Sequence, residues 1–160
     1  MTTVTERGNV MGWHDFYRRR DALDRIIDSG ELAVPDMFDG PGEVLLALQH
    51  RWSLQLAGRV ELAELADDQV GAIRDAWRAT ATANPALRRL LDEHAGHPAL
   101  RPMIRAEHRM LARSAGLTDA TDGPAEQAAV GAAFVGLVRS APEPRCKPME
   151  RFLRRLVPSG

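Results

Sequence analysis

Residues 84–101, NPALRRLLDEHAGHPALR, contain two prolines that each follow a polar residue and precede a run with helical spacing. Pro85 and Pro98 fit the first position of a helix, where proline loses no hydrogen bond and its φ is already helical. Pro124 and Pro148 stand in the same kind of place further along the chain. Because no segment alternates apolar and polar residues for long enough to be a strand, the sequence predicts an all-α fold.

The two proline-led segments also resemble each other. The motif x-Pro-Ala-Leu-Arg occurs at 84–88 and at 97–101, and each segment reaches a Glu-His pair, at 93–94 and 107–108. One interpretation is two equivalent helices that face a common partner. The other is ordinary helix-start composition in an alanine-rich chain, which we favour because structural repeats have longer periods.

Apolar spacing and the Gly and Pro positions define about six helices and a short C-terminal helix. We expect residues 1–10 to form a flexible tail and residues 11–160 to form a single helical domain. This domain should be a compact bundle with the helix over 124–140 near its centre. The expected helices cover residues 13–29, 42–66, 102–115, 124–140 and 148–157, with two more between Asp68 and Asn84 and between Pro85 and Gly96.

The composition is that of one soluble domain. With 160 residues, 44% hydrophobic and 27% charged, the chain can bury about 70% of its unfolded surface. A formal net charge of −1 gives no bulk attraction to nucleic acid or to a membrane. The longest uncharged apolar run, residues 128–138, is too short to span a bilayer, and the first ten residues contain no apolar run of the kind that a signal peptide needs. We expect a cytoplasmic protein without nucleic-acid or membrane partners, and its preference for arginine over lysine is typical of a GC-rich bacterium.

Four polar residues fall on apolar helix faces and form the candidate ligand-binding site: Arg20, Gln49, Arg59 and Glu107. An unpaired buried charge costs about 3–5 kcal/mol, so Arg20 and Glu107 should pair in the core. The pair either fixes the register of the helices, which we favour, or lines a pocket with Arg59 and Gln49. Such a pocket would suit a carboxylate or a phosphate.

The sequence gives little support to metal or covalent chemistry. His94, His97 and His108 are the candidate metal ligands, but a glycine and a proline on either side of His97 break the helical spacing. No HExxH motif or pair of Glu-x-x-His motifs is present. The serines lack a G-x-S-x-G context, and the single cysteine, Cys146, lies in a proline-rich linker. We expect no catalytic residue, metal or cofactor.

Two segments have the pattern of contact surfaces. Ala128, Ala132 and Gly136 recur every four residues and form a smooth strip, which by default packs inside the chain and otherwise lies at a dimer interface. The segment 148–157 has an apolar face flanked by arginines, as expected of a short docking helix. This helix docks either on its own bundle, which we favour because exposed apolar side chains are costly, or in the groove of a partner. The interface candidates on that face are Met149, Phe152 and Leu156.

Charge is unevenly distributed, with acidic residues concentrated over 28–68 and basic residues over 139–155. Opposite charges attract within one molecule or between subunits. Together these features favour a non-enzymatic protein-interaction or regulatory module that acts as a homodimer or binds a protein partner. The alternative is a domain that binds a small anion, or a modest enzyme, with its pocket around Arg20, Arg59 and Glu107.

Overall fold

The computed structural model describes the backbone of residues 5–142 and the side chains from residue 12 onward. These residues form six α-helices and one 3-10 turn, with no strand, so the prediction of an all-α fold is confirmed. The elements are α1 (Thr5–Ser29), α2 (Pro41–Ala63), α3 (Gln69–Ala83), α4 (Pro85–Glu93), η1 (Pro98–Leu100), α5 (Arg101–Ser114) and α6 (Pro124–Ser140). The helix expected over 148–157 lies outside the described residues.

Proline marks the helix starts as predicted. Pro85, Pro98 and Pro124 occupy the first positions of α4, η1 and α6, and Pro41 does the same for α2. None of the helices in residues 5–142 combines the length and the apolar character that a bilayer crossing requires.

Glycine and aspartate mark other helix ends. Gly30 and Gly116 follow α1 and α5 with φ of 70°, the left-handed conformation that closes many helices. Asp68 caps α3, because its carboxylate accepts a hydrogen bond from the Gly71 amide at 3.0 Å. Asn84 precedes α4, but its side-chain amide donates to Gln55 at 2.6 Å rather than capping that helix.

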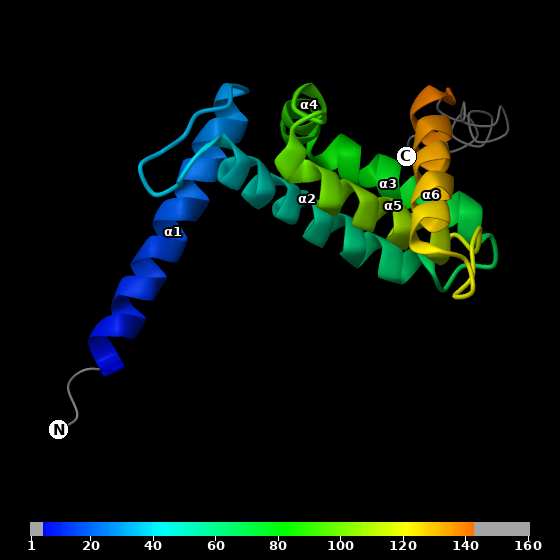
Figure 1. Cartoon of the computed structure of the whole chain (residues 1–160), viewed down its shortest axis with the longest axis horizontal. Coiled ribbons are helices and arrows are strands. Elements are labelled where there is room, and N and C mark those ends of the chain that lie inside the picture. Colours follow the sequence, from blue (N-terminus) through cyan, green and yellow to red (C-terminus); the bar gives the residue numbers. More distant parts are fainter. Residues whose placement is uncertain (1–4, 143–160) are drawn as a thin grey trace, which may run out of the picture.

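The body of the molecule is built around α2 (Figure 1), which contacts α1, α3, α4, η1 and α5. The side chains of Leu45, Leu48, Trp52 and Leu56 on α2 are fully buried. Helix α6 lies at the end of the body away from α1, so the expectation that the 124–140 helix would be central is wrong. The apolar residues around most of α2 make α2 the central helix instead.

Helices α5 and α6 cross at very short range. A Cβ atom placed on Gly131 of α6 would lie 1.9 Å from the carbonyl oxygen of His108 on α5. Only glycine fits a backbone approach of this kind. The buried face of α6 therefore centres on Gly131, with Phe134, Val135 and Val138 one and two turns further on.

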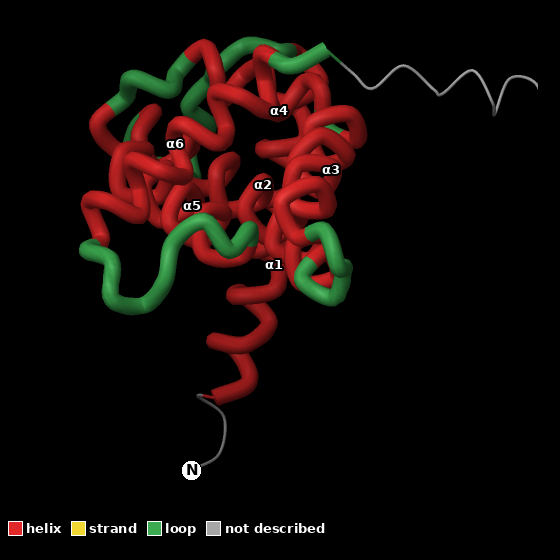
Figure 2. The backbone as a smooth tube through the Cα atoms, turned by 90° about the vertical axis from the view of Figure 1, so that its right-hand side faces the viewer, coloured by secondary structure: helices red, strands yellow, loops and turns green. Residues whose placement is uncertain are grey.

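Helix α1 lies across one end of α2, and its N-terminal half extends away from the body (Figure 2). It begins at Thr5, so the expectation of a tail over residues 1–10 is wrong for its second half. The loop after α1 is held to the body by Phe38, which is buried, and the Arg19 guanidinium lies 4.4 Å from the centre of its ring. Among the side chains described from residue 12 onward, the apolar ones that α1 buries are Ala22, Leu23 and Ile26, all in its C-terminal half.

Candidate functional site

Glu107 is a buried acidic side chain in the body of the molecule, as the sequence predicts. Its carboxylate accepts a hydrogen bond from the indole N–H of Trp52. Burial raises the pKa of Glu107, and the Trp52 hydrogen bond and the positive charges of Arg88 and Arg139 act in the opposite direction. Trp52 on α2 thus holds the Glu107 carboxylate, and Arg88 on α4 and Arg139 on α6 lie close enough to act on its pKa.

A layer of aromatic rings and ions surrounds this carboxylate. The rings of Trp52 and Trp77 meet edge to face, with centroids 5.8 Å apart. Arg88 lies 4.5 Å from the Trp52 centroid and Arg139 lies 5.0 Å from the Trp77 centroid. Both arginines also pair with Asp92, at 2.9 and 2.8 Å. Burial alone would raise the pKa of Asp92, but the Arg139 hydrogen bond and the Arg88 charge lower it.

This layer ties five helices together, α2 to α6. Five hollows stand out in the described part of the chain, and none of these five is lined by Glu107, Trp52 or Trp77. The indole nitrogen of Trp77 is buried and has no hydrogen-bond partner among the described residues. The arrangement favours the structural role that the sequence suggested for Glu107, with Trp52 as its partner instead of Arg20.

The four residues of the predicted pocket do not meet in one cavity. Arg20 is exposed, because α1 crosses the end of α2 and turns this side chain outward, so the prediction that it lies in the core is wrong. Gln49 is buried and donates to the Ser53 hydroxyl at 3.5 Å, while its carbonyl oxygen has no partner in residues 12–142. Arg59 is half-buried. No hollow includes two of the four residues.

The three histidines proposed as metal candidates have separate local roles. The His94 ring nitrogen lies 2.9 Å from the Leu90 carbonyl oxygen, and the His97 ring accepts a hydrogen bond from the Ala99 amide at 3.1 Å. Burial, followed by the Arg139 charge, lowers the pKa of His108. Among the described residues, no three His, Cys, Asp or Glu side chains are grouped as metal ligands would be.

The smooth strip on α6 faces outward. Ala132 and Gly136 are exposed and Ala128 is half-buried, so the default expectation that the strip packs inside the chain is wrong. The close contact uses Gly131 instead, which lies on another face of the helix. Sequence spacing could have indicated this face, because Gln127, Gly131, Phe134, Val135 and Val138 follow helical periodicity. Ala128 and Ala132 of the strip line a hollow between α5 and α6, whose other wall carries Arg101, Arg105 and Arg109.

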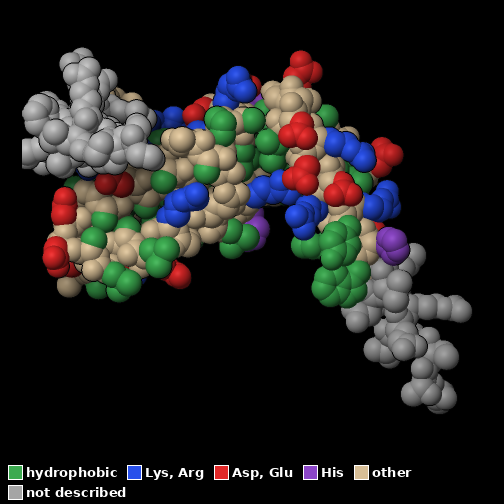
Figure 3. Space-filling model, turned by 180° about the vertical axis from the view of Figure 1, so that it is seen from behind, with side chains coloured by type: hydrophobic (Ala, Val, Ile, Leu, Met, Phe, Trp, Pro, Cys, Tyr) green, Lys and Arg blue, Asp and Glu red, His purple; other side chains and the backbone are tan. Residues whose placement is uncertain are grey.

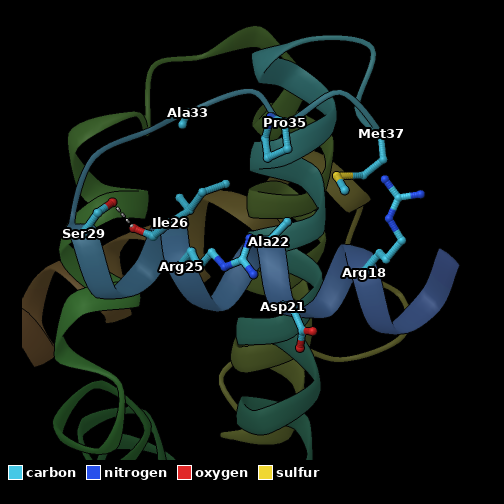
Figure 4. Close-up of a pocket in the computed structure, with 9 residues that line it drawn as sticks. All are labelled: Arg18, Asp21, Ala22, Arg25, Ile26, Ser29, Ala33, Pro35 and Met37. Carbon is cyan, nitrogen blue, oxygen red and sulfur yellow. Dashed lines mark hydrogen bonds between the residues drawn. The ribbon is translucent and has the colours of Figure 1, made fainter. Parts of the chain in front are cut away.

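A second hollow separates α1 from the loop that follows it (Figure 4). Its apolar lining includes Ile26, Pro35 and Met37. Figure 4 shows Arg18 reaching from α1 toward Met37, while Asp21 points away from the loop. None of the aromatic side chains of α1 lines this hollow.

The most unusual surface is the projecting end of α1. Trp13, Phe16 and Tyr17 are 59%, 58% and 51% exposed, although their spacing on the helix puts them on the same face as Leu23 and Ile27. The Trp13 and Tyr17 rings stack at 6.2 Å, and Phe16 meets each of them edge to face at 6.5 and 5.7 Å. Hydrophobic side chains gather on this part of α1 in the space-filling view (Figure 3). We call these three residues the aromatic end.

A groove between α1 and α2 continues from the aromatic end. Phe16, Leu23, Ala47 and Leu54 line it, and Leu54 is 62% exposed. Its rim is basic and partly fixed by ion pairs, from Arg19 to Glu43 at 3.0 Å and from Arg51 to Asp24. The aromatic end and the groove together form a continuous apolar surface across two helices.

The C-terminal interface candidates, Met149, Phe152 and Leu156, lie outside the described residues. The chain matches none of the protein-family models, curated proteins or solved structures with which it was compared. The aromatic end of α1 and the adjoining groove therefore stand as the candidate functional surface on the basis of their geometry.

Proposed function

We propose that this protein is a protein-interaction module whose contact surface is the aromatic end of α1 and the groove between α1 and α2. The observation that carries the proposal is the exposure of Trp13, Phe16 and Tyr17, each more than half accessible to solvent. Contiguous exposed apolar patches on soluble proteins mark interaction sites far more often than single exposed residues do. Aromatic side chains are also the residues that most often dominate binding energy.

The position of the patch supports the same conclusion. A helical segment of about 12 residues without tertiary contacts is only marginally stable in water. Residues 12–18 of α1 come close to this condition, because none of their side chains is buried. A partner that covers the aromatic end would supply the missing contacts and hold this part of α1 in helical form.

A photoreactive phenylalanine analogue in place of Phe16 tests this function in the native host cell. The proposal predicts a discrete cross-linked conjugate that disappears when Trp13→Ser and Leu54→Ser are added. The matched control carries the same probe at Leu137, which is 69% exposed on α6 and remote from the groove. Equal labelling from both positions, or none from position 16, would contradict an interaction surface on α1.

The second candidate function is binding of a small anion in the hollow between α5 and α6. Arg101, Arg105 and Arg109 follow each other at one-turn spacing, and none of them forms an ion pair within residues 12–142. Inorganic phosphate or citrate should then raise the melting temperature. Arg105→Gln should abolish that rise and Arg89→Gln, at an exposed position outside the hollow, should preserve it. An equal response in both variants would exclude this site.

A further inference from the structure

We infer that the occupant of this surface is a second copy of the same chain, with the two aromatic ends exchanged across a two-fold axis. The aromatic end of each copy would lie in the groove between α1 and α2 of the other. This inference rests on the interaction function proposed above and identifies its partner. The groove and the end belong to one surface of one chain, which is the condition for a closed, self-complementary contact.

The spacing along α1 points to a facing helix of the same kind. Trp13, Phe16, Arg20, Leu23 and Ile27 follow one another at intervals of three, four, three and four residues. This is the seam of a helix that packs lengthwise against another helix. Its C-terminal part is covered by the chain itself, since Leu23 is buried and Ile27 packs on the core, but its N-terminal part is exposed.

An antiparallel second α1 completes this seam. When the two helices cross near residue 18, Phe16 of each copy faces Arg20 of the other, and Trp13 faces Leu23 in the floor of the groove. Arg20 has no ion-pair partner among the described residues. A guanidinium over an aromatic ring is a favourable contact, so the exchange gives this exposed arginine a role that the single chain does not.

The available area is sufficient for a specific contact. A buried aromatic side chain covers about 150–250 Å², so three rings that are more than half exposed offer about 300 Å² per chain. Each end would also cover a similar area of the facing groove. Two exchanged ends would therefore bury about 1,200 Å² in total, which is near the lower bound for specific interfaces. The net charge of −1 adds little repulsion between copies.

Light scattering of the purified full-length chain at tens of micromolar tests the inference. We expect twice the chain mass for the unaltered protein and for Leu137→Glu. We expect the mass of a single chain for Phe16→Glu, with circular dichroism showing that the body remains helical. A monomeric unaltered protein, or a dimer that survives Phe16→Glu, would overturn the inference.

A cysteine pair tests the exchanged arrangement itself. In a Cys146→Ser background, one chain carries Trp13→Cys and the other carries Leu54→Cys, so a mixed disulfide can form only between copies. We expect the 13–54 disulfide in the mixture and no comparable product when Leu137→Cys replaces Leu54→Cys. Absence of the 13–54 product in a dimeric sample would overturn the exchange.

The two proposals fail in distinguishable ways. A monomer in light scattering combined with a discrete foreign conjugate from the photoprobe at position 16 would overturn the second copy and leave the interaction function standing. A monomer with no conjugate would overturn both. A conjugate between two copies of this chain supports both.

Discussion

The body around α2 and the projecting end of α1 differ in which side chains they bury and which they expose. In the body, a buried charged group is matched to a partner, since the Glu107 carboxylate accepts the Trp52 indole hydrogen. At the end of α1, apolar groups are exposed and matched only to one another, in the cluster of Trp13, Phe16 and Tyr17. Burial without partners and exposure of apolar groups are both unfavourable. The body buries its apolar side chains within one chain, whereas the end of α1 leaves its aromatic side chains exposed.

The largest expected effect contrasts two tryptophans. Trp52→Ala removes a fully buried ring from the core and should lower the free energy of unfolding by about 3–5 kcal/mol. Trp13→Ala should change it by less than about 0.5 kcal/mol per chain. Urea denaturation at low protein concentration measures both, because association then no longer contributes. Similar losses of unfolding free energy in the two variants would contradict the distinction between the body and the end of α1.

Two glycines of α6 give a sharper contrast on one helix. Gly131→Ala places a methyl group against the α5 backbone and should destabilise the protein by about 1–3 kcal/mol. Gly136 has nothing within 4 Å of its would-be Cβ, so Gly136→Ala should stabilise by about 0.5–1 kcal/mol through helix propensity. Thermal unfolding of the two variants measures the difference. A stabilising Gly131→Ala would show that α5 and α6 do not cross closely.

A double-mutant cycle tests whether Arg20 belongs to the body. Glu107→Met leaves the buried Trp52 indole unpaired and should cost about 1–3 kcal/mol. Arg20→Met changes an exposed side chain and should cost less than about 0.5 kcal/mol. Because the two residues do not meet, their effects should add within about 0.5 kcal/mol. Recovery of stability in the double variant would restore the ion pair that the sequence suggested.

The smallest effect concerns pH. Burial raises the pKa of Glu107, so the folded protein holds this proton more tightly than the unfolded chain. Its stabilising contribution is present below the unfolded pKa and is lost as the pH rises through the folded pKa. Glutamine does not titrate, so the Glu107→Gln variant does not lose this contribution as the pH rises. Its free energy of unfolding, relative to that of the unaltered protein, should therefore increase from acidic to neutral pH. Denaturant unfolding across this range measures the difference, and a constant difference would contradict a raised pKa.

The sequence predicted the parts of the fold that depend on local chemistry. The helix starts at Pro85, Pro98 and Pro124 follow from backbone constraints that act within a few residues. Glu107 was also placed correctly in the interior, because its neighbours on α5 define one apolar face.

The angle at which the helices cross could not be predicted from these local sequence patterns. Arg20 and Phe16 share a face with Leu23, but whether that face is covered depends on where α1 crosses α2. The prediction that the strip of Ala128, Ala132 and Gly136 packs inside the chain was wrong for a related reason. The rotation of α6 about its axis is set by the close approach at Gly131. Periodicity identifies a face, whereas tertiary packing decides which face is buried.

Hydrogen exchange at two protein concentrations tests most directly whether the end of α1 depends on a second copy. The amides of residues 45–56 in α2 should be protected equally at both concentrations, because the chain itself buries them. The amides of residues 13–20 in α1 should be protected at high concentration and should exchange rapidly on dilution, since local opening follows the loss of contacts. Protection of residues 13–20 that does not change with concentration would contradict the account.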